Sequence, residues 1–230
     1  MPSAASLIQE HVTFDGTGGR IEGILTYPEQ DDPQDSVLIV GPHPMLGGDF
    51  DNNVIRELAT QLAERNALTL RFNYRGVGQS DGNPVLSTNN IADFWARSRI
   101  DEESGFADDT AAAARFLKEV YGCVSHVVGY SFGAWLGSRW AAESEAVTSI
   151  SLVAPTISQH DYSHLSHLAI SKLIVASFDD FAVPTESLQQ QFLEWASPKR
   201  LVIENIDNHF FRGHESWLTE TVERFMRGES

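Results

Sequence analysis

A serine lies between two glycines in the run Gly129-Tyr130-Ser131-Phe132-Gly133, which fits the pattern G-x-S-x-G. Apolar residues over 124–130 predict a strand before this serine, and residues 132–143 predict a helix after it. A serine on such a sharp turn is held in a strained conformation that exposes its hydroxyl. The pattern therefore predicts Ser131 as a nucleophile. The alternative, a buried glycine-rich turn with an incidental serine, stays open.

A neutral serine hydroxyl is a poor nucleophile, so Ser131 needs a base and a group that orients the base. His209 follows the last predicted strand within a short loop, and aromatic residues after it can shield an imidazole from bulk water. We therefore expect His209 to be the base. Four other histidines compete for this role, but none follows a predicted strand in this way: His160, His164, His167 and His214.

Two aspartates, Asp179 and Asp180, follow the preceding strand of 173–176 and are both candidates for the orienting acid. Either of them could instead be a solvated turn residue. The clustered histidines upstream do not indicate a zinc site, because no acidic or cysteine partners complete a ligand set. The sequence thus indicates acyl transfer through a serine, a histidine and an aspartate, without a metal or an organic cofactor.

Short apolar runs alternate with segments of helical periodicity along most of the chain, which predicts parallel strands joined by helical crossovers. Before them, two segments around a glycine cluster, 11–14 and 21–27, predict an antiparallel hairpin. The expected strands are 37–40, 68–72, 124–130, 147–153, 173–176 and 201–203. The expected helices are 54–62 with Asp51 as its cap, 109–120, 132–143, 185–195 and 215–226. We therefore expect an α/β fold with a mostly parallel eight-stranded sheet and helices on both faces.

One stretch, 84–105, is longer than the usual connection between a strand and a helix. It leaves a parallel strand at the carboxyl edge of the sheet, where ligands bind in open α/β folds. We expect this insertion to cover the active site and to supply an apolar wall from Phe94 and Trp95, which together with Ile91 could form a short helix. A surface excursion packed by its own aromatic residues remains the alternative.

Composition limits the classes of partner. The 230 residues are 42% hydrophobic, which suffices for one sizeable core, so we expect a single domain over 1–230. Lys and Arg number 16 against 32 Asp and Glu, and the formal net charge of -16 argues against nucleic acid and anionic membranes as partners. The lone Cys123 cannot form an internal disulfide. Residues 1–6 lack the pattern of a secretory signal, so a cytoplasmic location is the default expectation.

Three segments resemble the α/β-hydrolase superfamily: the serine turn, the Asp-x-x-Val-Pro of Asp180 to Pro184, and Asn208-His209-Phe210-Phe211. Two more, His43-Pro44-Met45-Leu46-Gly47-Gly48 and the run Arg71 to Ser80, resemble a compact, capless bacterial branch of it related to dienelactone hydrolases. The resemblance spans about residues 37–225. It implies an α/β-hydrolase fold without a large cap domain.

The resemblance also implies roles for particular residues. It favours Asp180 as the acid, because the family places the acid four positions before the proline of 184, and Asp179 is the reserve candidate. It assigns the two amides that stabilise an oxyanion to Phe132 and Met45. The run 71–80 is structural in similar hydrolases, where it braces the nucleophile turn.

The function expected from these features is hydrolysis of a carboxylic ester of a small or medium soluble substrate through an acyl-enzyme on Ser131. A thioesterase or C–C bond hydrolase with the same triad, and a non-catalytic ligand-binding or scaffold protein, are the alternatives. Peptidase action is less expected. Self-association into a homodimer is left open. The side chains expected to contact the substrate are His43, Tyr130, Phe94, Trp95 and Phe210.

Overall fold

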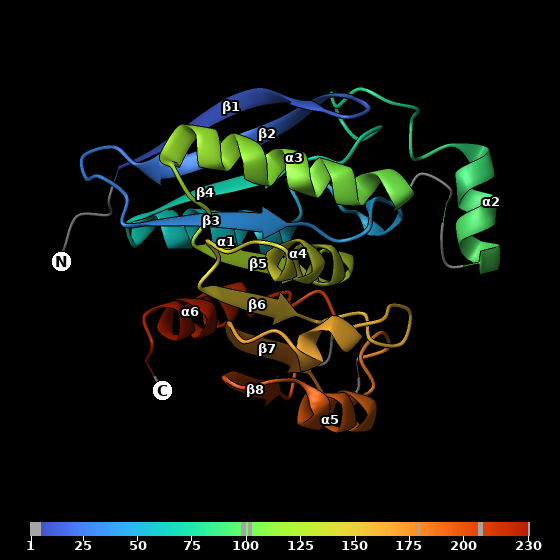
Figure 1. The fold of residues 1–230 in the computed structure, drawn as a ribbon. Helices are drawn as coiled ribbons and strands as arrows, with labels where there is room; N and C mark the ends of the chain where they lie inside the picture. The colour runs from blue at the N-terminus through green and yellow to red at the C-terminus, as the bar shows by residue number, and fades with distance from the viewer. Residues whose placement is uncertain (1–5, 98–99, 101–102, 179, 207–208, 230) are drawn as a thin grey trace.

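A computed structural model describes residues 6–97, 100, 103–178, 180–206 and 209–229, apart from the side chain of Trp95. The described residues form eight strands in one sheet, in the order β1-β2-β4-β3-β5-β6-β7-β8 (Figure 1). The strands are β1 (Leu7–Gly16), β2 (Gly19–Pro28), β3 (Asp35–Val40), β4 (Ala67–Phe72), β5 (His126–Tyr130), β6 (Ser149–Val153), β7 (Ser171–Ser177) and β8 (Lys199–Glu204). β1 and β2 form an antiparallel hairpin, β2 pairs antiparallel with β4, and the strands from β4 to β8 in this order run parallel. The predicted α/β-hydrolase fold is confirmed.

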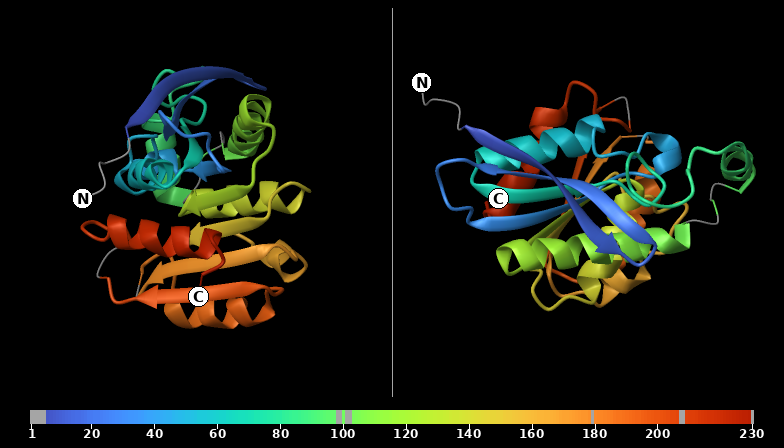
Figure 2. Two further views of the ribbon diagram at one scale, coloured as in Figure 1. Left: turned by 90° about the vertical axis from the view of Figure 1, so that its left-hand side faces the viewer. Right: turned by 90° about the horizontal axis from the view of Figure 1, so that it is seen from above.

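Helices cover both faces of this sheet. The described helices are α1 (Asn53–Glu64), α2 (Thr88–Arg97), α3 (Glu103–Tyr121), α4 (Phe132–Ala142), α5 (Thr185–Glu194) and α6 (Glu215–Met226), with short 3-10 turns η1 (Pro44–Leu46) and η2 (Ser163–Ser166). Figure 2 shows α1 and α6 on one face and α3 and α4 on the other. Because both faces are covered, the β3 residues Val37 to Val40 are fully buried, as their uninterrupted apolar run predicts.

The cap of α1 differs from the expectation. Asn52, not Asp51, precedes the first helical residue, and its side chain accepts a hydrogen bond from the Val54 amide at 3.1 Å. Asp51 lies one residue too early for this contact, and its own amide donates to the Asp49 carboxylate. Asn and Asp cap helices equally well, so residue type alone could not separate the two positions.

Helix α3 begins at Glu103, six residues before the predicted start. Periodicity missed this first turn because it contains Gly105, a poor helix former. A β-carbon at Gly105 would lie 2.4 Å from the Cζ of Arg75. Glycine therefore lets the guanidinium of Arg75 pass the helix and bind the buried carboxylate of Asp109, at 2.7 Å from Nη2 to Oδ1. This ion pair fixes the start of α3 against the loop after β4.

The insertion of 84–105 contains helix α2, which stands beyond the carboxyl edge of the sheet (Figures 1 and 2). Val85 before the helix and Ile100 after it are both buried, so the segment is anchored on each side. Ile91 is 41% exposed, and the apolar side expected for this helix is therefore only partly covered. Phe94 packs against the core and stacks on His43.

Candidate active site

The loop between β5 and α4 holds Ser131 with φ 56° and ψ −118°, a conformation that residues other than glycine rarely adopt. The two flanking glycines are needed for close approach. A β-carbon at Gly133 would lie 2.1 Å from the Val40 carbonyl oxygen, and one at Gly129 would lie 2.4 Å from the carbonyl oxygen of Gly133. The sharp turn thus lifts the serine hydroxyl above the strand end, at the amino terminus of α4.

Three side chains from separate loops are hydrogen-bonded in series at this point. His209 Nε2 lies 3.1 Å from Ser131 Oγ. On the other side of the ring, His209 Nδ1 lies 2.7 Å from Asp180 Oδ2 and 2.9 Å from Oδ1. All three residues are buried. The structure therefore brings together the serine, histidine and aspartate that the sequence predicted, and we call them the Ser131 trio.

Neighbouring groups fix the imidazole and the carboxylate. The Ala182 amide donates to Asp180 Oδ1 at 2.8 Å. The Tyr130 hydroxyl donates to the carbonyl of His209 at 3.0 Å, and burial raises the pKa of this phenol well above its usual value, so it keeps its proton. Phe181 lies against the His209 ring with 4.8 Å between ring centres. Asp180 and His209 are thereby held in one orientation.

Tyr130 was expected to contact the substrate, and the structure corrects this. Its side chain is 1% exposed and lies behind His209, where its hydroxyl is already hydrogen-bonded. The alternation of side chains along β5 turns Tyr130 away from the nucleophile that follows it. Asp179, the reserve candidate for the acid, lies outside the described residues.

The two amides expected to stabilise an oxyanion differ in their surroundings. Phe132 is the first residue of α4, where backbone N–H groups have no partner within the helix and the helix dipole is positive. The Met45 amide lies in η1 and donates to the imidazole Nδ1 of His43 at 3.1 Å. The tyrosine of the run 71–80 supports this region, because the Tyr74 hydroxyl donates to the Gly41 carbonyl at 2.8 Å just before the turn. The run thus braces the Met45 loop.

A cavity of about 270 Å³ opens at the Ser131 trio. Of the expected substrate contacts, His43 and Phe94 line it. Phe210 is 38% exposed beside the His209 ring, and the Trp95 side chain lies outside the described part of the chain. The cavity is lined by His43, Leu46, Phe94, Glu103, Ser131, Phe132, Thr156, Gln159, His160, Phe181, Ala182 and His209.

Sequence reasoning missed the polar residues that line this cavity. Thr156, Gln159 and His160 come from the loop after β6, and His160 Nδ1 lies 2.8 Å from Thr156 Oγ1. The His160 ring packs between Phe132 and Trp135. One signal was present: this loop also follows a parallel strand and so lies at the edge where ligands bind. The missed Glu103 had no such signal, because the sequence placed it inside an irregular insertion.

The cavity wall carries no lysine or arginine among the residues that the structure describes. Arg97, outside the cavity on α2, forms an ion pair with Asp93 one turn earlier, at 2.8 Å. An i,i+4 pair on an exposed helix face is an ordinary surface contact. Among the wall residues that the structure describes, Glu103 is the one carboxylic acid.

Within the described ranges, no three His, Cys, Asp or Glu side chains gather closely enough to hold a metal ion. His164, one of the clustered histidines, instead contacts the Ser138 hydroxyl at 2.9 Å. Across the same ranges, the helices are too short or too polar to cross a bilayer.

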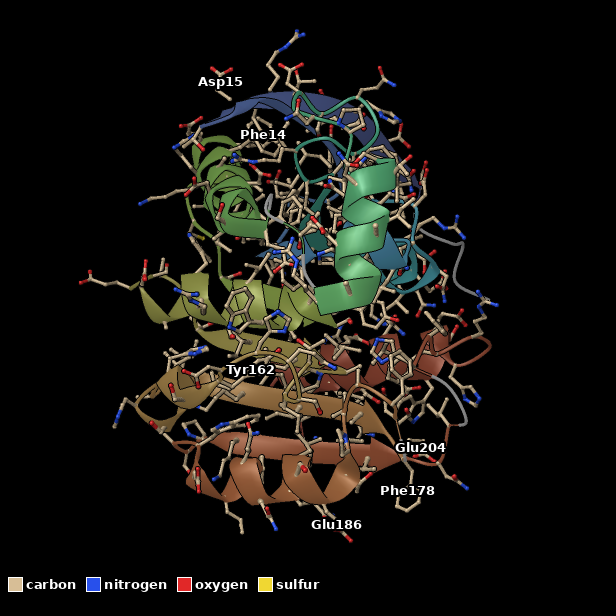
Figure 3. The ribbon with its side chains drawn as sticks, turned by 90° about the vertical axis from the view of Figure 1, so that its right-hand side faces the viewer. Phe14, Asp15, Tyr162, Phe178, Glu186 and Glu204 are labelled. Atoms are coloured by element: carbon tan, nitrogen blue, oxygen red, sulfur yellow. The ribbon has the colours of Figure 1, made fainter. Side chains whose placement is uncertain are left out.

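Figure 3 looks onto the carboxyl edge of the parallel strands, with α2 standing in front of it. Phe178 and Glu204, labelled there, mark the ends of β7 and β8, and the Phe178 amide donates to the Glu204 carbonyl at 2.8 Å. The Asp180 loop leaves this same edge immediately after Phe178. The trio, the cavity and the insertion helix therefore share one edge of the sheet.

Known proteins share this architecture. The profile of the hydrolase family described as Serine aminopeptidase, S33, matches residues 50–229. An alpha-beta serine hydrolase homologue from Coxiella burnetii is 29% identical, with TM-score 0.79, over 94% of this chain and 96% of its own. A putative alpha/beta hydrolase of unknown function from Agrobacterium tumefaciens is 26% identical, with TM-score 0.79, over 96% and 98%. An uncharacterised protein of Rickettsia prowazekii is 26% identical over 226 residues, 94% of this chain and 87% of that protein. The chain belongs to the hydrolase family described as Serine aminopeptidase, S33, within the α/β-hydrolase superfamily.

Proposed function

We propose that this protein hydrolyses carboxylic esters of small or medium soluble substrates through an acyl-enzyme on Ser131. The observation that carries the proposal is the Ser131 trio on a strained turn beside a cavity. A strained serine alone is not a nucleophile, and a hydrogen-bonded histidine alone is not a base. Their combination at a helix amino terminus is the arrangement that acyl transfer requires.

In the proposed reaction, His209 Nε2 takes the proton of the Ser131 hydroxyl as its oxygen attacks the ester carbon. Asp180 holds the ring with Nε2 toward the serine and stabilises the imidazolium that forms. The amides of Phe132 and Met45 donate to the oxyanion. The imidazolium then protonates the leaving alcohol, and water, activated by the same histidine, releases the acid.

The cavity supports a neutral substrate with an apolar acyl group. Its apolar lining includes Leu46, Phe94 and Phe181, and Thr156 and Gln159 add polar groups without a charge. A carboxylate on the substrate would meet Glu103 and no lysine or arginine among the described wall residues. In a site partly shielded from water, like charges at short distance are strongly unfavourable. We therefore expect anionic esters to be poor substrates.

The family description favours a second candidate, cleavage of an amino-terminal residue from a peptide. Such a substrate presents an ammonium group, and Glu103 is the carboxylate available on the described wall. This carboxylate already accepts hydrogen bonds from His43 and from the Ile100 amide, which weakens the case for an ammonium site. Comparing kcat/KM for aminoacyl anilides and for esters distinguishes this candidate from the esterase.

The test begins with a fluorophosphonate probe, followed by mass spectrometry of the labelled peptide. Labelling at Ser131 that is lost in the Ser131→Ala variant supports the proposed nucleophile, whereas labelling spread over several serines favours a binding or scaffold protein. A panel of neutral esters, anionic esters, thioesters, C–C bond substrates and aminoacyl anilides then compares kcat/KM. Highest values for neutral esters are expected. Highest values for any other class would replace the ester in the proposal.

A further inference from the structure

A second hydrogen-bonded series lies beside the Ser131 trio and ends on the loop that carries Met45. The Met45 amide donates to His43 Nδ1 at 3.1 Å, and His43 Nε2 lies 3.2 Å from Glu103 Oε1. The same Oε1 accepts from the Ile100 amide at 3.0 Å. Glu103 is the first residue of α3, so this series joins the end of the insertion to the Met45 loop.

The chemistry of imidazole determines the direction of this series. A neutral imidazole has one donor nitrogen and one acceptor nitrogen. Because His43 Nδ1 accepts from the Met45 amide, the ring hydrogen is on Nε2, which donates to the Glu103 carboxylate. Without that acceptor, the hydrogen can move to Nδ1. There it would face the Met45 N–H, and two donors would repel each other across the turn.

The surroundings leave little room for water to replace these contacts. His43 is 5% exposed. Its ring stacks on Phe94 with 4.9 Å between centres and meets the Phe132 ring edge to face at 5.0 Å. Phe132 carries the other amide assigned to the oxyanion, so the residues of both amides contact this one imidazole. Buried polar groups of this kind are costly when they lose a partner.

We propose that Glu103 is a positioning residue that acts through His43 to set the Met45 amide for catalysis. This rests on the proposed function, because the amide matters only where an oxyanion forms. While a neutral ester carbonyl is bound, the amide keeps its imidazole partner. As negative charge develops, the oxyanion shares this N–H with the imidazole, which still holds the turn in place. Glu103 therefore contributes to the transition state more than to the bound substrate.

Two substitutions at one position test this role. Glu103→Gln keeps an Oε1 that accepts from both His43 and Ile100, whereas Glu103→Leu removes the acceptor at similar size. We expect the leucine variant to lose about 10- to 100-fold in kcat with KM within about 3-fold, since a whole oxyanion donor is worth about 10²–10³. The glutamine variant should recover kcat to within about 5-fold of wild type. Affinity for a trifluoromethyl ketone, which forms an oxyanion on the serine, should fall in parallel with kcat.

A double variant tests whether Glu103 acts through His43. An asparagine at 43 can accept from the amide two residues later, as in an Asx turn, but cannot reach Glu103. In the His43→Asn background, Glu103→Leu should therefore cost no more than about 2-fold in kcat.

Asp161→Ala is a control for the loss of a side-chain contact at the start of a helix. Asp161 accepts from the Ser163 amide at 2.8 Å at the start of η2. That variant should change the melting temperature and leave kcat intact.

Nitrogen NMR of the His43 ring gives a readout that needs no turnover. Wild type and Glu103→Gln should carry the hydrogen on Nε2, and Glu103→Leu should shift it toward Nδ1. Equal kcat in the leucine variant and wild type, a change confined to KM, or an unchanged tautomer would overturn the proposal. A wild type that turns over no substrate and leaves the probe unreacted would instead overturn the proposed function, whatever tautomer the ring shows.

Discussion

Serine, histidine and aspartate side chains are hydrogen-bonded in series at both ends of the parallel strands. At the amino end, His126 Nδ1 contacts the Ser149 hydroxyl, and His126 Nε2 lies 3.3 Å from Asp35 Oδ1. We call these three the Ser149 trio. By residue type it matches the Ser131 trio at the carboxyl end, but the ring is reversed, because Nδ1 faces the serine and Nε2 faces the aspartate. Residue types alone would therefore not separate a candidate active site from a structural contact.

The backbone and the surroundings do separate them. Ser149 lies in regular strand β6, in register with His126 on one neighbouring strand and Ser171 on the other. Ser131 instead has φ 56° and is followed at once by α4, so it lies at the amino terminus of a helix. The Asp35 side chain is 46% exposed, whereas that of Asp180 is fully buried. Strain, an adjacent helix amino terminus and a cavity mark the candidate site, and composition does not.

Removing the two serines should give the largest contrast. Ser131→Ala is expected to lower kcat by about 10⁴-fold or more, because the attacking oxygen is lost. Ser149→Ala should leave kcat within about 2-fold and lower the free energy of unfolding by about 1 kcal/mol, the usual value of one hydrogen bond. Ester kinetics and urea denaturation of both variants measure this. The stability of Ser131→Ala should stay within about 1 kcal/mol of wild type.

Ester hydrolysis by Ser131→Ala near the wild-type rate, or its loss in Ser149→Ala, would reverse the assignment of the two trios.

The two aspartates should differ next most. Asp180→Asn keeps the shape but no longer selects the correct tautomer of His209, and we expect a loss of about 10³- to 10⁴-fold in kcat. Asp35→Asn and Asp179→Asn should each cost less than about 3-fold. The comparison uses kcat at pH 7 for the three purified variants. A larger loss in Asp179→Asn than in Asp180→Asn would transfer the acid role.

Two residues of α2 differ in whether they line the cavity, so their alanine variants should differ in substrate preference. Phe94 lines the cavity, and Ile91 on the same helix is 41% exposed and is not among its lining residues. Phe94→Ala should change kcat/KM unequally, by about 10-fold between short and long acyl chains, since each methylene in a pocket is worth about 1–3 kcal/mol. Ile91→Ala should shift all chain lengths equally and little. Equal effects from both variants would make α2 a surface element.

The smallest expected effect is on how the free energy of unfolding changes at acid pH. Burial lowers the pKa of His126, although Asp35 opposes the shift, so the folded state binds this proton less readily than the unfolded state. Stability due to a neutral His126 is therefore present above the ordinary histidine value of about 6.5 and falls as pH drops below it. In His126→Gln, the loss of unfolding free energy between pH 7 and 5 should be smaller. His164, whose pKa burial also lowers, is unchanged in this comparison.

Urea denaturation at the two pH values measures this difference. Equal losses in wild type and His126→Gln would show that the Ser149 trio does not couple to pH, and kcat at pH 7 should stay within about 2-fold in either case.

The sequence by itself determined the alternation of strands and helices, the strained serine turn and the order of the three trio residues. These features are local. An apolar run, a pair of glycines or a turn after a strand leaves its signal within about ten residues. The ends of elements were less well determined. Asn and Asp cap helices equally well, which left Asn52 and Asp51 unseparated, and Gly105 in the first turn of α3 makes room for the distant Arg75.

Only the tertiary structure decided which distant residues meet. Glu103 reaches His43 across 60 positions, and His126 reaches Asp35 across 91. No local pattern distinguishes a glutamate that holds an imidazole from one that faces solvent, since both are compatible with the first turn of a helix. The crossing of strands in the sheet brings such pairs together, and their burial then determines how much each contact matters.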